Sequence, residues 1–420
     1  MSCMQASRKI KITLLILILV SLGFVVLYFD DWRSSRQLAI ARRALQDRDA
    51  DKALDATREA ARMTPHNGEV HFTMARAFRR QGQLDKMRDS LERAAKFGVT
   101  RNRIQREEWM AMAQAGQLKE ARPYLSELLM NPGGDGPEIC EAYVKGYFLI
   151  YQFPEAFQIL DAWEKDYPSD PQPHVFRATA SSEVANWNAT AKSLRRALEL
   201  APNRNDIRIE LATTLRILKE TDEAAQLLEQ ARKSQPNNPE VLVGWAQVLR
   251  DRGQVDQAQS MLDRVLQEVP KHVVALRLLG EIHSSAGRFT EAIQLLEDCV
   301  AIKSKDEKAR YALGTALQGV GRASEAKQHF EFVAKTVEAN HRLDQLLTAV
   351  RIKNDDVAAR FEIAEVLRVT GEPQERLLWL RSVIALDPAH KAAHAELAKC
   401  YAELGNLEES KKHSRLAEAD

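Results

Sequence analysis

PEVLVGWAQVLRDRGQVDQAQSMLDRVLQEVPKH, residues Pro239–His272, consists of two amphipathic stretches separated by Gly253. On both sides of this glycine the apolar residues recur at intervals of three and four, which predicts two helices joined by a turn. Pro202, Pro236 and Pro270 follow one another at intervals of 34 residues. A fixed period of this length indicates a stacked repeat array.

The same frame can be followed from Ser34 to the last residue. Small residues recur at the eighth and twentieth positions of the units, as Ala41 and Ala53 do in the first unit and Gly280 and Ala292 do in a later one. Each helix pair has an apolar stripe that it cannot bury alone, so neighbouring units are expected to stack into one continuous core.

This pattern resembles the tetratricopeptide-repeat (TPR) family, with its small residue at position eight, glycine near fifteen, alanine at twenty and twenty-seven and proline at thirty-two. The resemblance covers about residues 34–420, in about eleven units. It implies an all-α fold, a right-handed superhelical solenoid of antiparallel helix pairs, in which the first helix of each pair lines a concave groove. The groove would hold a protein or peptide partner.

The frame divides this region into nine units over 34–340, a helical insertion over 341–356, and two units over 357–420 that end in a polar capping helix. The first nine units are irregular at 131–167, where one extra residue is followed by many aromatic side chains. Two interpretations are open: the aromatic residues fill a widened junction, or they form a groove for a peptide or a sugar. Phe148 is the candidate groove residue.

The insertion lies in a stretch without proline or glycine from Ser324 to Asn354, with apolar residues at helical spacing. It predicts one long helix, or two helices with a tight joint, that offsets the last two units. A passive insertion and a partner site are both compatible with it.

Before the repeats, a short basic tail over 1–11 precedes the uncharged stretch 12–29, ITLLILILVSLGFVVLYF. Eighteen apolar residues approach the length that spans a bilayer, which predicts a transmembrane signal-anchor helix. We therefore expect a single-pass protein of the bacterial inner (cytoplasmic) membrane, with its TPR region outside the cytosol and with the membrane contacted through 12–29. The alternative is a signal peptide whose cleavage leaves a soluble secreted adaptor.

The composition argues against several other classes of function. A net charge of +1 disfavours a nucleic-acid binder. The four cysteines are too scattered for a disulfide framework or a metal knuckle, and no nucleotide-binding or hydrolase motif occurs. His390 and His394 could share a helix face, but no third ligand accompanies them. No catalytic, cofactor-binding or metal-binding residue is predicted, and the chain is expected not to be an enzyme.

Arginines are the remaining candidates for partner binding. Most of them cluster on or beside the first helices of the opening three units, and two recur at matching groove positions further along. Either they belong to a solvated face compensated by Asp47, Asp85 and Asp89, or they bind an anionic partner. This partner would be an acidic protein segment, an anionic glycan or lipid headgroups near the anchor, since guanidinium groups pair well with carboxylates and phosphates. The set comprises Arg42, Arg76, Arg79, Arg80, Arg103, Arg106, Arg216 and Arg250.

Taken together, the sequence predicts a membrane-anchored TPR scaffold that mediates protein–protein interaction and organises an envelope or secretion complex. One alternative is the secreted adaptor. Another, of a different class, is a non-catalytic subunit of a glycan-synthesis or export enzyme complex.

Overall fold

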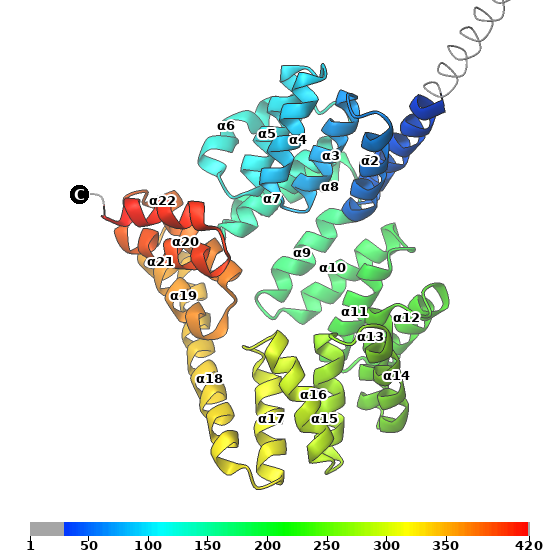
Figure 1. Ribbon diagram of the computed structural model, residues 1–420, viewed down its shortest axis with the longest axis vertical. Helices are drawn as coiled ribbons and strands as arrows, with labels where there is room; N and C mark the ends of the chain where they lie inside the picture. The colour runs from blue at the N-terminus through cyan, green and yellow to red at the C-terminus, as the bar shows by residue number, and fades with distance from the viewer. Residues whose placement is uncertain (1–28, 419–420) are drawn as a thin grey trace, which may run out of the picture. The chain divides into compact units, whose positions relative to one another are not determined.

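The computed structural model describes residues 29–418, which contain helices and no strand (Figure 1). The all-α prediction is therefore confirmed for this part of the chain. It forms two compact units, one that ends at Gly146 and one that begins at Tyr147. Each unit is described by itself below.

The first unit begins with the helical residues 29–46. Its helices then follow one another through short turns, and the last of them continues three residues past the unit boundary. They are α2 (Ala50–Met63), α3 (Gly68–Arg80), α4 (Leu84–Lys96), α5 (Arg101–Gln114), α6 (Leu118–Met130) and α7 (Gly136–Leu149).

The second unit continues the same arrangement, and from α9 onwards each helix packs against the next one along the chain. Its helices are α8 (Phe153–Asp166), α9 (Gln172–Ser182), α10 (Trp187–Leu200), α11 (Asn205–Ile217), α12 (Thr221–Ser234), α13 (Pro239–Asp251), α14 (Val255–Glu268), α15 (Val273–Ser285), α16 (Phe289–Ile302), α17 (Glu307–Gly319), α18 (Ala323–Ile352), α19 (Val357–Thr370), α20 (Pro373–Leu386), α21 (Lys391–Glu403) and α22 (Leu407–Glu418).

The turn within most helix pairs uses one backbone geometry, from which Gly371, between α19 and α20, departs with a φ of -98°. Gly253, the fifteenth residue of its unit, has a φ of 76°, in the left-handed region that glycine enters without a steric penalty. The same position in other units is occupied by residues with side chains, and these adopt the same geometry: Arg48 (φ 62°), Tyr151 (φ 59°), Ala185 (φ 52°) and Lys219 (φ 67°). The fold imposes this turn even where the residue does not favour it.

Close helix contacts explain the small residues of the frame. A Cβ atom on Gly280 of α15 would lie 2.5 Å from the Leu296 side chain of α16, and one on Gly314 of α17 would lie 2.9 Å from Phe330 of α18. Both distances are below van der Waals contact, so only glycine allows these helices to approach. These two first helices therefore pack closely on the second helix of their own pair.

The insertion predicted over 341–356 forms no separate element. α18 is a single helix of 30 residues that begins in the ninth unit and runs through most of the inserted residues. Its last turns share a hydrophobic core with α19, α20 and α21, in which Leu346 and Val350 pack with Ile363, Leu380 and Leu397.

Within the second unit, the turn before α8 contacts helices more than 200 residues later in the chain. The ring of Tyr151 stacks on that of Trp379 with 3.9 Å between centroids. Arg360, which is 1% exposed, donates to the carbonyl of Ile150 at 2.7 Å and to that of Asn354 at 2.8 Å. Burial lowers the pKa of Arg360 to about 10. The last repeats thereby close onto the start of the second unit.

The predicted membrane location is corrected by the helices that the structure contains. Across 29–418, no helix is both long enough and apolar enough to cross a membrane. The prediction of a single-pass membrane protein is therefore wrong as it stands. The stretch 12–29, on which it rested, lies outside the described residues apart from Phe29.

Candidate partner-binding groove

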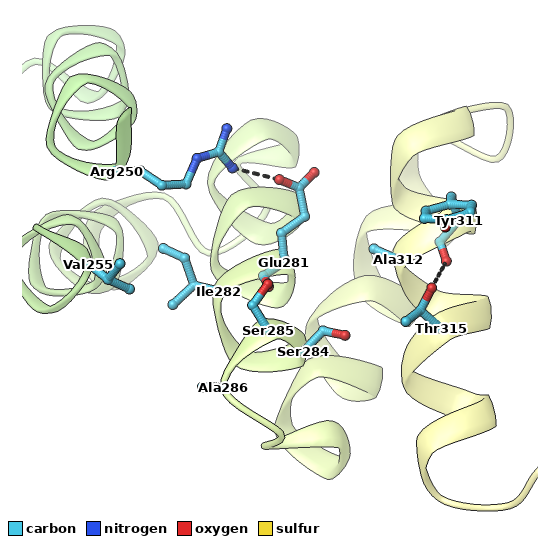
Figure 2. A pocket seen from close by; sticks show the side chains of 10 residues that line it. All are labelled: Arg250, Val255, Glu281, Ile282, Ser284, Ser285, Ala286, Tyr311, Ala312 and Thr315. Carbon is cyan, nitrogen blue, oxygen red and sulfur yellow. Dashed lines mark hydrogen bonds and ion pairs between the residues drawn. The ribbon is translucent and has the colours of Figure 1, made fainter. Parts of the chain in front are cut away.

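A groove of about 660 Å³ opens on the second unit between α13, α14, α15 and α17. Figure 2 shows its lining side chains, which come mainly from the first helices of three successive pairs. The residues that line it are Arg250, Val255, Glu281, Ile282, Ser284, Ser285, Ala286, Tyr311, Ala312 and Thr315.

One end of the groove carries a chain of charges. Arg250 of α13 reaches across to Glu281 of α15, with 2.7 Å between Nη1 and the carboxylate (Figure 2). Arg277 pairs with the other oxygen of Glu281 at 2.9 Å and lies 3.7 Å from the Asp306 carboxylate. These side chains are partly exposed, so they fix orientation at the groove more than they stabilise the fold.

The other end is apolar and aromatic. Tyr311 is 59% exposed although its ring also contacts Phe330 edge-on, with 5.8 Å between centroids. Ala312 follows Tyr311 on α17, whereas Val255, 40% exposed, lies on the Arg250 side of the groove (Figure 2). A half-exposed tyrosine beside aliphatic surface is typical of residues that anchor a protein partner, because the ring buries a large area at little cost in entropy.

Hydroxyl groups lie between these two ends. Ser284 and Ser285 come from the last turn of α15, and Thr315 lies one turn after Tyr311 on α17 (Figure 2). The Thr315 hydroxyl donates to the carbonyl of Tyr311 at 3.0 Å, which leaves its oxygen lone pairs on the groove side as acceptors. The groove thus offers polar contacts in its middle and an apolar anchor point at one end.

Three of the predicted arginines lie in a buried ion network of the first unit. Arg79 is 2% exposed and contacts Glu107 at 2.7 Å and Glu138 at 2.8 Å. Arg76 and Arg80 contact Glu138 at 2.8 and 2.7 Å. The three guanidinium groups lower the pKa of Glu138 against the opposing effect of burial. The sequence analysis named other carboxylates, Asp47, Asp85 and Asp89, as their counterions.

A second carboxylate extends this network. Burial alone would raise the pKa of Glu141, but the charges of Lys145, Arg80 and Arg48 outweigh it and lower the pKa to about 2. Lys145 makes the shortest of these contacts, 2.7 Å. The face of the first unit that carries these arginines is therefore filled by the chain's own charges.

The other predicted arginines also have partners within the chain. Arg42 and Arg103 both contact Glu69, whose pKa the hydrogen bond from Arg103 lowers. Arg106 donates to the carbonyl of Pro132 at 3.5 Å. Arg216 contacts Asp251 at 2.7 Å. An acidic partner would have to displace these intramolecular contacts. Of the predicted arginines, Arg250 is the one that lines the groove.

Phe148 packs within an aromatic cluster of the second unit. Its ring lies 5.2 Å from that of Phe153 and 5.8 Å from that of Phe176, and Trp163 nearby is fully buried. These contacts fit the interpretation in which the aromatic residues after the extra turn residue fill a junction. Phe148 does not line the groove between α13 and α17.

The two histidines considered as metal ligands have separate structural roles. His390 accepts from the backbone N–H of Ala393 and caps α21. His394 is buried against His413 of α22, with 2.8 Å between their Nδ1 atoms.

Sequence reasoning missed Tyr311, Ser284 and Ser285 altogether. Glu281 and Thr315 were not among the predicted partner-binding residues either. Tyr311 carried one usable signal: it is a large aromatic residue on the first helix of its pair, the helix that the TPR resemblance places at the groove.

Comparison with known families accounts for the repeats. Tetratricopeptide-repeat models match residues 38–98, 185–242 and 215–282. The chain contains tetratricopeptide repeats. The resemblance noted in the sequence is therefore confirmed over these residues. A model described as anaphase-promoting complex, cyclosome, subunit 3 matches 251–333. No curated protein matches the chain.

Several solved structures are similar to the chain at low identity and with TM-scores below 0.5. A human IFIT1 dimer with m7Gppp-AAAA is 17% identical, with 85% of this chain and 91% of that chain covered and a TM-score of 0.44. A tetratricopeptide-repeat protein from Parabacteroides merdae is 15% identical over 59% of this chain and 92% of that chain, with a TM-score of 0.32. YrrB, described as a TPR protein with an unusual peptide-binding site, is 20% identical over 46% and 91%, with a TM-score of 0.24. Likeness at this level does not say what this chain binds.

Proposed function

We propose that this chain is a non-catalytic TPR scaffold that binds a segment of a partner protein in the groove between α13, α15 and α17. The observation that carries the proposal is the groove itself, about 660 Å³ in volume, in which the exposed Tyr311 lies beside apolar surface and a row of hydroxyl groups. That combination suits a peptide, whose side chains need an apolar anchor and whose backbone needs hydrogen-bonding partners.

The partner segment packs an apolar side chain against Tyr311. Its backbone hydrogen-bonds to Ser284, Ser285 and Thr315, while the Arg250–Glu281 ion pair marks the polar end of the groove. Covering about 100 Å² of the Tyr311 ring and its surroundings contributes about 2.5 kcal/mol. Most of the binding energy therefore comes from the apolar end.

The narrower prediction, an envelope or secretion complex, rested on the membrane anchor, and no contact within 29–418 supports it. A secreted adaptor, a subunit of a glycan-synthesis complex, the absence of catalysis and the absence of a nucleic-acid partner all stay predictions.

Site-specific photo-crosslinking tests the proposal. A benzophenone amino acid is placed at Tyr311 of the full-length chain in its native cells, and a control chain carries it at Gln294, exposed on α16 away from the groove. The crosslinked peptides are identified by mass spectrometry. We expect one protein segment to be captured from position 311 and not from position 294. The proposal is overturned if position 311 yields no protein, or only the proteins that position 294 also yields.

A further inference from the structure

A second surface of the chain becomes apparent when the same frame positions are compared across units. At position 24 stand Leu91, Leu194, Leu228, Leu262 and Leu296, each at most 2% exposed. At position 27 stand Ala94, Ala197, Ala231, Val265 and Cys299, each at most 1% exposed. Both positions lie on the second helix of a pair, in the core between the first helix of the same pair and the first helix of the next pair. In a regular array this stacking face is never open to solvent.

The ninth unit is different. Its residues at these positions, Phe330 and Val333 of α18, are only partly buried, and Val337 one turn later is 55% exposed. A groove of about 430 Å³ lies on this face. It is lined by Gln318, Ala323, Ala326, Lys327, Phe330, Glu331 and Ala334.

The length of α18 explains the difference. In a regular array α19 would follow the ninth unit and pack on its stacking face. Because α18 continues to Ile352, α19 packs on its last turns instead, at Leu346 and Val350. The core that contains Phe330 and the core that contains Leu346 are separate clusters. Among the helices of residues 29–418, none of a following pair covers the stacking face of the ninth unit as it does in the neighbouring units.

We propose that this face, formed by Ala326, Phe330, Ala334 and Val337, binds an amphipathic helix of a partner protein in the place of the missing repeat helix. The chain itself shows what such a helix looks like. The stacking face of α16, with Leu296 and Cys299, shares its core with five residues of α17: Ala309, Ala312, Leu313, Ala316 and Leu317. The partner helix therefore carries alanine and leucine at intervals of three and four.

The rim of this groove carries both signs of charge. On α18, the Lys327 Nζ atom lies 3.8 Å from the Glu331 carboxylate. Lys335 and Glu338 follow one and two turns after Glu331. A rim of balanced charge gives little electrostatic steering, so binding depends on apolar contact and changes little with salt concentration. This surface is distinct from the groove between α13 and α17, and the two proposals can fail separately.

A copy of α17 serves as the probe. The peptide Glu307–Gly319 is stapled between positions 311 and 315, which are both exposed in the chain, because an unstapled peptide of 13 residues would be mostly unfolded. It carries a fluorophore, and its anisotropy is measured against the full-length chain. The variants are Ala334→Arg, in the groove, and Gln328→Arg, exposed on the opposite side of α18.

We expect the peptide to bind saturably. Ala334→Arg in the chain should weaken this binding at least tenfold, and Gln328→Arg should leave it unchanged. A peptide that carries Leu313→Ser and Leu317→Ser should not bind. Circular dichroism of the two variants checks that both are folded. No saturable binding, or equal weakening by both arginine variants, overturns the proposal. A dimer of the chain that Ala334→Arg dissociates in light scattering also overturns it, because a second copy would then cover this face.

Discussion

At the scale of single residues, the turn within most helix pairs requires a left-handed backbone at the fifteenth position, even in units that differ in sequence. Ala185 and Lys219 hold a left-handed backbone at the position where Gly253 holds it without a side chain. This conformation costs a residue with a Cβ atom about 1 kcal/mol of stability. Glycine avoids this steric cost but loses more backbone entropy on folding, so the net gain on replacement by glycine is smaller.

Ala185→Gly is therefore expected to stabilise the second unit by about 0.5 kcal/mol. The effect is measured as the shift in the midpoint of urea unfolding, with hydrogen exchange in α9 and α10 as the readout. Thr213→Gly, at an exposed position inside α11, should have the opposite sign, a loss of about 0.5 kcal/mol. If both glycines destabilise, the left-handed turn carries no strain.

The buried histidine pair makes the docking of α22 sensitive to pH. His394 Nε2 lies 3.0 Å from the carbonyl of Pro388 and donates to it, so its Nδ1 accepts from Nδ1–H of His413. This hydrogen bond needs one donor and one acceptor nitrogen, so it is lost when both Nδ1 atoms carry a proton. Burial, and then the charge of His394, lower the pKa of His413 to about 4, with smaller effects from Glu409, Lys412 and Arg381.

Because the folded pKa of His413 lies below its unfolded value of about 6.5, its contribution is complete above that pH and is lost as the pH falls towards 4. Hydrogen exchange of α22 amides, compared at pH 7 and 4.5 after correction for the intrinsic rate, should show faster opening at the lower pH. His413→Gln should remove the difference, and His341→Gln, at an exposed site, should keep it. The same pH response in all three proteins would contradict this account.

At the scale of helices, α3, α5 and α7 are tied together by the buried network around Arg79. Leaving a buried charge without its partner lowers the free energy of unfolding by more than an exposed ion pair raises it. Arg79→Met leaves Glu107 and Glu138 with one cation fewer, and it should destabilise the first unit by about 3 kcal/mol in denaturant unfolding. Arg88→Met, whose exposed arginine pairs with Asp85, should cost less than about 0.5 kcal/mol. Similar losses in both variants would argue against the network's importance.

The helices are also where the sequence was most informative. The 34-residue period predicted the pairs, and the absence of proline and glycine predicted a long helix at the frame shift, seen as α18. Neither pattern showed the consequence for Phe330, since exposure depends on which helix packs there. The arginines were misleading for a related reason: their partners, such as Glu138 for Arg76 and Arg80, lie about 60 residues away, at distances that the frame does not reveal.

At the scale of the second unit as a whole, closure onto its own start could not have been predicted from the repeat. The contacts of Tyr151 with Trp379 and of Arg360 with Ile150 join segments more than 200 residues apart and follow no period. The closed arrangement restricts the ways in which the last repeats can move.

Trp379→Ala should release both sides of this closure together, with a local loss of about 3 kcal/mol. Hydrogen exchange should rise in 147–153 and in α19–α21 of the same variant, while α13–α15 stay protected. Trp32→Ala, whose ring is 54% exposed, serves as the control and should leave both regions unchanged. Faster exchange on only one side would show that the two segments are held independently.

The central claim, that the groove between α13, α15 and α17 binds a protein segment, is tested most directly by titration. The segment crosslinked from position 311 is synthesised as a peptide, and its Kd is measured calorimetrically for the unaltered chain, for Thr315→Trp, which fills the groove, and for Gln294→Trp, which adds the same bulk outside it. The account predicts binding at least tenfold weaker for Thr315→Trp and unchanged binding for Gln294→Trp. Equal affinity in all three proteins would contradict it.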